Sequence, residues 1–541
     1  MAFRGTGPRW TGTTQEHQSA ADRVAGQTER DLDLAEPIHW GVGGLAYILL
    51  LVITVRLHWN DLVNHDVAWL QIAAEKWLDG SRYGSAIVEI NTPGAMLLYV
   101  PLAWAAKLTG IDARHMIGLW LGLIALVAAI LTGHAAAVMA GMPRRSRLAF
   151  LSTFLVYCIF TFYPTSEIAQ RDHLIAMALL PYGLIAMNGQ AHKFARIDQL
   201  GASAMTALAL CVKPQYLLVV MAIFIVAVAQ RAASRNWRQI LWESCRQLDL
   251  PLLVFVGALY IAVVAFFFAD WLRLVWDLGR VFGVYSAPGV FTLLRCHTPI
   301  LALIAATAAL CFPLPGRHYF ATCVILAVAT FVLVQLEGKP WPYHQLPIFL
   351  FLSAGAALSF VIWLPTLMRS ARHPLAVCVL VILIPTILIL SSVISADQDQ
   401  SRIESLPVAE ALRSVAHRGD KVIFLSDSLA PGLALVSDQG YQWALRYPCL
   451  WPLVGAVTLR GTGKLDQASA AHMIDDVADN VATDIGINHP AVIVVDHQRE
   501  MSFLPPGTEI LPLMLQSPAF ADAMNSYHVQ SVTSDFTIYV Q

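Results

Sequence analysis

Long apolar runs alternate with short polar segments from residue 40 to residue 395. A helix that crosses the hydrocarbon core of a bilayer needs about 20 predominantly apolar residues. This pattern predicts a polytopic α-helical membrane protein with about 11 transmembrane helices. The predicted spans are residues 40–57, 115–140, 148–163, 173–188, 199–212, 215–230, 250–268, 297–312, 319–336, 345–365 and 375–395.

The charged loops between these runs predict which side of the membrane each loop occupies. Lys and Arg are enriched in short cytoplasmic loops. The basic clusters lie around Arg144, Lys193, Arg235, Arg317 and Arg369. With eleven spans, all of these loops fall on the same side as the N-terminus. We therefore expect a cytoplasmic N-terminus and a C-terminus on the outer, periplasmic face.

Two apolar segments of the first outer loop, residues 58–114, are too short to cross the membrane. Fourteen helical residues, 95–108, rise about 21 Å, whereas the hydrocarbon core is about 30 Å thick. We predict that this helix begins at Pro93, bends near Pro101 and stays at the outer surface. Residues 66–79 carry tryptophans and other apolar side chains on one face, which predicts a second interfacial helix.

The composition divides the chain into three parts. Residues 1–38 are polar and predict a disordered cytoplasmic N-terminus without a cleavable signal. Residues 39–396 form the predicted transmembrane domain, and residues 397–541 a periplasmic α/β domain large enough for its own core. In this domain we expect strands near residues 421–426, 491–496 and 536–540, and helices near 402–417 and 466–483.

Overall composition excludes some function classes. The 541 residues are 57% hydrophobic and 13% charged, and the formal net charge is −2. A chain without a basic excess is not expected to bind nucleic acid. The eight cysteines form no CxxC pair and show no metal-ligand spacing. A disulfide between Cys296 and Cys449, both outside the predicted spans, is left open.

The first outer loop contains the most informative candidate residues. His65 and Asp66 follow the first span, and Asn91, Thr92 and Pro93 precede the second short helix. Asp66 at a helix start can complement the positive end of the helix dipole. A carboxylate held outside the first span is also where an enzyme acting on a lipid-linked substrate would keep a general base.

This arrangement resembles the GT-C superfamily of membrane glycosyltransferases, which includes protein O-mannosyltransferases and lipid A aminoarabinose transferases. Those families place a catalytic aspartate in the first outer loop, and a Pro-containing segment opens the next helix. The matching positions are Asp66 and Thr92-Pro93-Gly94. The usual double proline is absent, and His65-Asp66 stands where an Asp-Glu pair is usual. The resemblance covers roughly residues 40–345 and implies a catalytic role for Asp66.

The second outer loop carries Glu167, Arg171 and Asp172. The Arg171-Asp172 pair matches the Arg-Asp segment that ends the corresponding loop in GT-C enzymes. The resemblance implies that Asp172 orients the acceptor or supports the base, with Glu167 and His65 near the substrate. The alternative is a surface ion pair that contributes about 0–1 kcal/mol.

Later outer loops supply candidate groups for a phosphate and a sugar. Lys213 precedes a proline between two apolar runs, and the resemblance implies that it meets the phosphate of a lipid carrier, as Arg171 can. Lys339 and His344 are further candidates for the phosphate, and Trp341 and Tyr343 offer ring faces to a sugar. Snorkelling of Lys213 and an aromatic anchor at the membrane interface are the alternatives.

The predicted function is glycosyl transfer from a polyprenyl-phosphate sugar to a hydroxyl of a lipid, glycan or protein acceptor. The expected location is the periplasmic face of a bacterial inner membrane, among membrane lipids. No cofactor is expected, and no carboxylate cluster demands a divalent metal. A transporter or flippase for a lipid-linked sugar and a non-catalytic assembly protein remain the alternatives.

Overall fold

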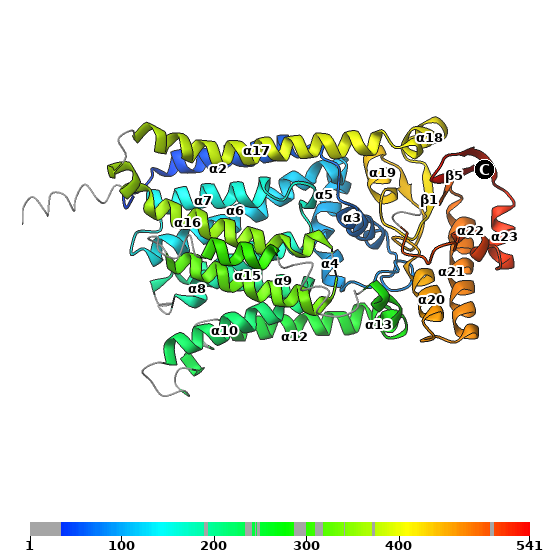
Figure 1. The fold of residues 1–541 in the computed structure, drawn as a ribbon, viewed down its shortest axis with the longest axis horizontal. Helices are drawn as coiled ribbons and strands as arrows, with labels where there is room; N and C mark the ends of the chain where they lie inside the picture. Colours follow the sequence, from blue (N-terminus) through cyan, green and yellow to red (C-terminus); the bar gives the residue numbers. More distant parts are fainter. Residues whose placement is uncertain are drawn as a thin grey trace, which may run out of the picture.

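The structure is a computed structural model, and the chain folds into a helical bundle with a small sheet at one end (Figure 1). Most of the predicted N-terminal tail, residues 1–33, lies outside the described residues. The structure describes residues 34–541 except for 189–192, 233–237, 239–240, 244, 246–248, 286–298, 309–316, 340, 371–373 and 498–501.

Ten long helices of the described residues follow the predicted apolar runs and lie lengthwise in the bundle (Figure 1). They are α2 (Trp40–Leu57), α6 (Ala113–Met139), α7 (Arg147–Phe162), α8 (Arg171–Met187), α9 (Arg196–Val212), α10 (Leu217–Ala232), α12 (Leu250–Phe267), α15 (Arg317–Glu337), α16 (Leu346–Ser370) and α17 (Pro374–Glu404).

The bundle has the composition of a membrane domain. Among the described residues, four helices are long and apolar enough to cross a membrane: Ala113–Met139, Leu250–Phe267, Arg317–Glu337 and Leu346–Leu364. Four more apolar helices are shorter, Gly41–Leu57, Arg147–Phe162, Pro214–Gln230 and Pro299–Ala308. The predicted helical membrane fold with a C-terminal sheet is confirmed, whereas the number of spans stays a prediction.

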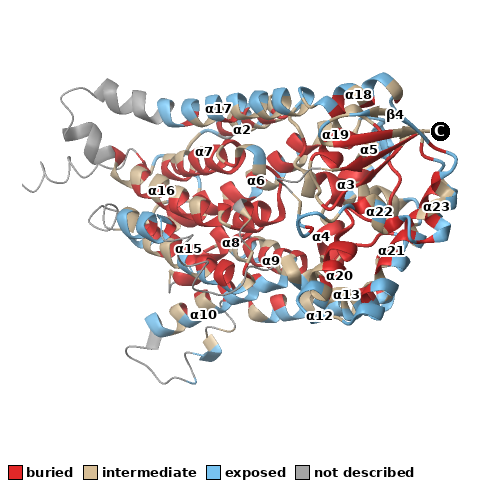
Figure 2. Cartoon of the chain, turned by 45° about the vertical axis from the view of Figure 1, so that its right-hand side comes forward, coloured by how far each residue is buried: buried red, intermediate tan, exposed pale blue. Residues whose placement is uncertain are grey.

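Small residues allow the central helices to approach closely. A Cβ atom on Gly133 of α6 would lie 2.2 Å from Thr153 Oγ1 of α7. Ala128 and Ala129 on α6 are fully buried. Helices in membranes pack through such small side chains. Figure 2 shows the buried residues along α6, α7 and α8, and the exposed ones along α17 and α12.

The first outer loop forms three helices, α3 (His65–Leu78), α4 (Pro93–Leu97) and α5 (Val100–Thr109). The predicted helix over residues 95–108 is therefore two helices, because Pro101 in the first turn of α5 has no N–H to continue α4. The predicted helix over 66–79 is α3. We expected its tryptophans at the membrane interface, but Trp69 is only 2% exposed. Helix α3 is enclosed by α4, by α5 and by α19 (Gly432–Gln439) of the C-terminal region, all of which pack against it.

The C-terminal region contains a five-stranded sheet in the order β2-β1-β3-β5-β4. Strands β2, β1 and β3 are parallel, and β5 runs antiparallel to both β3 and β4. The three predicted strands correspond to β1, β3 and β5. The strands are β1 (Lys421–Leu425), β2 (Gln442–Trp443), β3 (Val492–Asp496), β4 (His528–Val532) and β5 (Phe536–Val540).

Helices surround this sheet (Figure 1). They are α18 (Pro407–Val415), α19 (Gly432–Gln439), α20 (Trp451–Gly461), α21 (Gln467–Asn488), α22 (Ile510–Met514) and α23 (Pro518–Met524). Helix α17 continues from the bundle to Glu404, past the predicted domain boundary at residue 397, and that boundary stays a prediction.

Polar contacts fasten the C-terminal region to the first outer loop. Lys76 Nζ donates to the Leu445 carbonyl at 2.5 Å, and the Val88 N–H donates to the Arg446 carbonyl at 2.8 Å. Burial lowers the pKa of Lys76 to about 8. These contacts place the C-terminal region directly over α3 and the segment that follows it.

Candidate active site

Asp66 lies in the first turn of α3, at the positive end of the helix dipole. Asn64 caps this helix, because its Oδ1 accepts the Asp66 N–H at 3.0 Å. The positive end of the helix dipole stabilises negative charge at this position. The Asp66 side chain is half-buried, and its Oδ2 accepts a hydrogen bond from Gln170 Nε2 at 3.3 Å.

The second outer loop faces Asp66 and has a constrained backbone. Thr165 and Ala169 have positive φ angles of 48° and 60°, which non-glycine residues rarely adopt. The Ala169 carbonyl accepts from the Tyr99 hydroxyl at 2.8 Å, and its N–H donates to His173 Nδ1 at 3.1 Å. These contacts hold the loop in a strained shape, as is common at functional sites.

This loop directs Glu167 and Gln170 toward the start of α3. Glu167 Oε2 accepts hydrogen bonds from Gln170 Nε2 and Asn64 Nδ2, each at 3.2 Å. Burial raises the pKa of Glu167, whereas the nearby His65 opposes this shift. Asn64, Asp66, Glu167 and Gln170 thus form one hydrogen-bonded group at the outer end of the bundle.

Arg171 is a buried cation held by a neutral amide. It opens α8 and is 6% exposed. One guanidinium nitrogen, Nη1, donates to Asn91 Oδ1, and its Nε has no hydrogen-bond partner among the described residues. Arg171 interacts electrostatically with Asp66, Asp172 and Glu89. No carboxylate of the described residues lies within ion-pair distance of it.

Lys213, in contrast, is surrounded by carboxylates. Its Nζ lies 3.0 Å from Asp172 Oδ1 and 3.1 Å from Glu337 Oε2. Tyr216 donates its hydroxyl to Asp172 Oδ1 at 2.7 Å, and His344 Nδ1 lies 2.7 Å from Glu337 Oε2. The predicted phosphate ligand Lys213 is therefore already compensated by two negative charges.

His344 belongs to this ion-pair network. Burial and the neighbouring Lys213 lower the pKa of its imidazole below the ordinary value. At neutral pH the ring is thus neutral, so His344 does not offer a positive charge to a phosphate.

Lys339, in the last outer loop, lies between aromatic rings of that loop and of α13 (Ala269–Phe282). Its Nζ is 4.4 Å from the centre of the Phe282 ring and 5.0 Å from that of Trp341. Burial, together with the positive charge of Lys213, lowers the pKa of Lys339 to about 8. No carboxylate lies within ion-pair distance of Lys339 in the part of the chain that the structure describes.

Aromatic side chains connect this loop to Asp66. Trp341 stacks on Tyr343 with ring centres 5.9 Å apart. Tyr343 is 7% exposed and interacts electrostatically with Asp66 and Arg171. The structure thus brings all the predicted site residues to the outer end of the bundle: His65, Asp66, Glu167, Arg171, Asp172, Lys213, Lys339, Trp341, Tyr343 and His344.

The motif segment Thr92-Pro93-Gly94 packs against the end of α9. Thr92 Oγ1 donates to the carbonyls of Cys211 and Val212 at 3.1 and 2.8 Å. A Cβ atom on Gly94 would lie 2.1 Å from the Cys211 carbonyl oxygen, so only glycine fits. The segment therefore fixes the helix end that presents Lys213.

Sequence reasoning missed several members of the cluster. Glu337 ends an apolar run on the side of the membrane where Lys213 is also predicted to lie. This shared side could have indicated that the two residues meet. Tyr216 lies three residues after Lys213. No signal in a single sequence pairs Gln170 with Asp66, which lie in separate loops, or Glu89 with Trp69, which lie 20 residues apart in one loop.

Two further expectations concern a metal site and a disulfide. None of their His, Cys, Asp and Glu side chains form a group of three or more arranged to hold a metal ion. The expectation that the protein works without a cofactor stays a prediction. Cys449 is free, and its suggested partner Cys296 lies outside the described residues.

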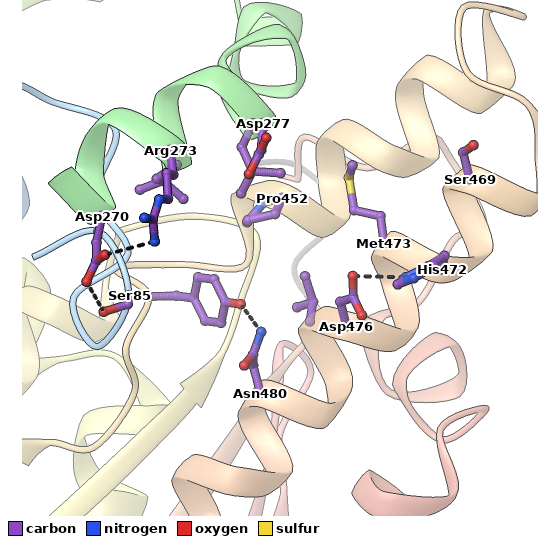
Figure 3. A pocket seen from close by; sticks show the side chains of 15 residues that line it. Ser85, Asp270, Arg273, Asp277, Pro452, Ser469, His472, Met473, Asp476 and Asn480 are labelled. Carbon is purple, nitrogen blue, oxygen red and sulfur yellow. Dashed lines mark hydrogen bonds and ion pairs between the residues drawn. The ribbon is translucent and has the colours of Figure 1, made fainter. Parts of the chain in front are cut away.

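A separate open groove of about 630 Å³ lies between α13 (Ala269–Phe282) and α21 (Figure 3). Asp270 and Arg273 of α13 line one wall, and His472 and Asp476 of α21 the other. None of the predicted site residues lines this groove. We therefore place the candidate active site at the charged residues around Asp66 and not in this groove.

No protein-family model matches the sequence, and no curated protein matches it. Several solved structures are similar to it in fold. The TM-score is 0.52 with ArnT from Cupriavidus metallidurans bound to undecaprenyl phosphate, at 13% identity over 92% of this chain and 97% of that chain. ArnT from the same organism in the apo state gives 0.48 at 14% identity, over 92% and 97%.

A third match is the archaeal oligosaccharyltransferase AglB from Archaeoglobus fulgidus, with a TM-score of 0.40 at 13% identity over 91% of this chain and 74% of that chain. At these identities the likeness concerns the fold, and the match to lipid-bound ArnT carries it. Over almost the whole of both chains the protein is similar in fold to ArnT, so the predicted resemblance is confirmed at the level of the fold.

Proposed function

We propose that this protein is a membrane glycosyltransferase that moves a hexose or pentose from a polyprenyl-phosphate donor to an acceptor hydroxyl. The fold shared with ArnT supports this proposal, and that ArnT structure holds undecaprenyl phosphate. The acceptor is a lipid, a glycan or a protein. The reaction takes place at the outer, periplasmic face of a bacterial inner membrane, with the N-terminus in the cytoplasm.

One observation carries the proposal. Arg171 and Lys339 are cations without a carboxylate ion pair among the described residues, and both interact electrostatically with Asp66. The unpartnered Nε of Arg171 and the half-buried amine of Lys339 are both donors that an added anion can accept from. The phosphate of a lipid carrier supplies that anion. We therefore assign the phosphate to Arg171 and Lys339 rather than to Lys213.

Asp66 acts as the general base in this scheme. It removes the proton of the acceptor hydroxyl as the hydroxyl oxygen bonds to the anomeric carbon of the sugar. The bond between that carbon and the phosphate oxygen breaks, and its electron pair leaves with the polyprenyl phosphate. Arg171 and Lys339 stabilise the developing negative charge. A single displacement of this kind inverts the anomeric centre.

The remaining residues orient these groups. Gln170 and Glu167 hold Asp66 and its helix start, and His65 adjoins them. The ion-pair network of Asp172, Lys213, Glu337 and His344 fixes α8, α9 and α15 relative to one another. Trp341 and Tyr343 offer ring faces to the donor sugar. Asp172 bonds Lys213 and Tyr216, so in this scheme it holds the start of α8 in place and transfers no proton.

The test compares the wild-type protein with Asp66→Asn in proteoliposomes that contain a radiolabelled polyprenyl-phosphate sugar and membrane extract as the source of acceptor. We expect the variant to bind undecaprenyl phosphate as tightly as the wild type and to transfer no label. Unchanged transfer by the variant would overturn the proposal. Movement of the donor across the bilayer without transfer would instead indicate a flippase.

A further inference from the structure

Glu89 is a buried carboxylate in the segment that follows α3, and it accepts hydrogen bonds from three donors. Its Oε1 accepts the Asn91 N–H at 2.6 Å and the Asn91 Nδ2 amide at 2.7 Å. Its Oε2 accepts the indole N–H of Trp69 at 2.5 Å. Glu89 is 4% exposed. Burial raises its pKa, whereas the hydrogen bonds and the nearby Arg171 oppose this shift.

These bonds determine which end of the Asn91 side chain faces Arg171. An ionised carboxylate only accepts hydrogen bonds, whereas an asparagine amide has one oxygen that accepts and one NH2 that donates. Because Glu89 takes the NH2 group, Oδ1 of Asn91 points away from Glu89. That oxygen accepts the bond from Arg171 Nη1. Glu89 thus sets the orientation of the Asn91 amide, and this orientation presents a hydrogen-bond acceptor to the guanidinium.

The segment around Glu89 is anchored on both sides, so this geometry has little freedom to adjust. The Val88 N–H donates to the Arg446 carbonyl of the C-terminal region at 2.8 Å. On the other side, the indole N–H of Trp271 in α13 donates to the Ile90 carbonyl at 3.3 Å. The C-terminal region and α13 therefore both hold the segment that carries Glu89.

We propose that Glu89 is a positioning residue that fixes the Asn91 amide, so that Arg171 presents its free Nε to the phosphate of a polyprenyl-phosphate ligand. The inference rests on the proposed function and extends it to a residue that does not touch the ligand. It also gives the C-terminal region a role, because Arg446 anchors this segment. A glutamine at position 89 keeps one acceptor oxygen and places its NH2 group against either the Asn91 donors or the Trp69 indole, so it loosens the hold on the Asn91 amide.

The experiment measures the affinity of the purified full-length protein in nanodiscs for two probes, undecaprenyl phosphate and undecaprenol. The two lipids share a chain and differ only in the phosphate. For Glu89→Gln we expect an affinity for undecaprenyl phosphate about tenfold lower than that of the wild type. The affinity for undecaprenol should stay within about twofold. A merely structural disturbance would weaken both probes together.

Two further variants keep the result interpretable. Asp249→Asn removes another buried carboxylate, 4% exposed and paired with Arg196 at the other end of the bundle, and should change neither affinity. Asn91→Leu removes the amide and should mimic Glu89→Gln. The double variant Glu89→Gln/Asn91→Leu should lose no more affinity than either single variant, because both act on one chain of contacts.

The outcomes separate this inference from the proposed function. A wild-type protein that binds the two lipids equally well would contradict the proposed function itself. A wild-type protein that prefers the phosphate, with Glu89→Gln keeping that preference, would overturn only the role of Glu89. If Glu89→Gln fails to fold, a normal phosphate preference in Asn91→Leu would overturn it in the same way.

Discussion

The two ends of the helical bundle accommodate buried charge in opposite ways. At the predicted cytoplasmic end, Asp198 pairs with Arg144 at 2.7 Å and Asp249 with Arg196 at 2.6 Å. The carboxylates there are buried, and both arginines reach solvent. At the outer end, Arg171 is buried, and no described carboxylate lies within ion-pair distance of it.

The comparison distinguishes ion pairs that stabilise the fold from a charged group that is available to bind a ligand. A buried carboxylate with a cation beside it needs nothing further. The buried guanidinium of Arg171 donates to one amide, and its Nε keeps a free donor that an anionic ligand can accept from. The outer end contains both kinds, because Lys213 is compensated and Arg171 is not. Variants of these residues test this distinction.

The largest effect should follow loss of the base. Asp66→Asn removes the only group that we assign to proton abstraction, and general bases contribute roughly 10²- to 10⁴-fold to rate. We expect sugar transfer to fall about 1000-fold with unchanged binding of undecaprenyl phosphate. Rates of transfer under single-turnover conditions measure this. A loss of binding that matches the loss of transfer would mean that Asp66 serves the ligand rather than the chemistry.

Lys213→Met should act mainly on stability. The variant leaves Asp172 and Glu337 close together without their shared cation, and breaking a buried ion pair costs about 3–5 kcal/mol. Thermal unfolding in detergent should show a large decrease in Tm. Asp249→Asn, which leaves Arg196 in solvent, should lower the Tm less. Equal decreases would mean that the Lys213 network is no more important to the fold than the cytoplasmic pair.

Arg171→Met should act mainly on binding. Hydrogen bonds to charged groups contribute about 1.5–3 kcal/mol, so we expect undecaprenyl phosphate to bind roughly 10- to 100-fold more weakly. Its Tm should change less than that of Lys213→Met. Titration of both variants with the lipid checks this. If Lys213→Met loses the phosphate and Arg171→Met keeps it, the assignment of the two cations is reversed.

Lys339 should make binding depend on pH. Because the pKa of its amine is about 8, the cation that attracts phosphate is lost as the pH rises through that value. Affinity for undecaprenyl phosphate should therefore decrease by a few-fold between pH 7 and pH 9. Lys339→Arg, whose side chain stays charged, should remove this decrease. A decrease that persists in the arginine variant would have to come from another group.

Much of the fold could be predicted from the sequence, because apolar length and loop charge constrain it strongly. The runs at 40–57 and 250–268 became α2 and α12 almost residue for residue. The position of α3 could not be predicted in the same way. Its apolar face reads like a membrane-surface helix, but Trp69 packs inside the protein and donates to Glu89. The neighbours of α3 include α19 of the C-terminal region, which lies far along the chain and which no local pattern indicates.

The candidate site was predicted as a set of residues but not as a network. Lys213 stood out because a charge between apolar runs is expensive, and Asp66 and Asp172 stood out by their positions in the outer loops and by the family resemblance. Which carboxylates compensate which cations depends on distances between helices that no local pattern encodes. Lys213 and Arg171 therefore looked equivalent in sequence. The contacts with Glu337 and Asn91 distinguish them.

A structure of the protein with undecaprenyl phosphate bound, determined by electron cryomicroscopy, tests the central claim most directly. The account predicts a phosphate oxygen about 3 Å from Arg171 Nε, with Lys339 on its other side and Asp66 facing the same space. A phosphate bound beside Lys213 alone, in the groove between α13 and α21, or at the cytoplasmic end of the bundle would contradict it.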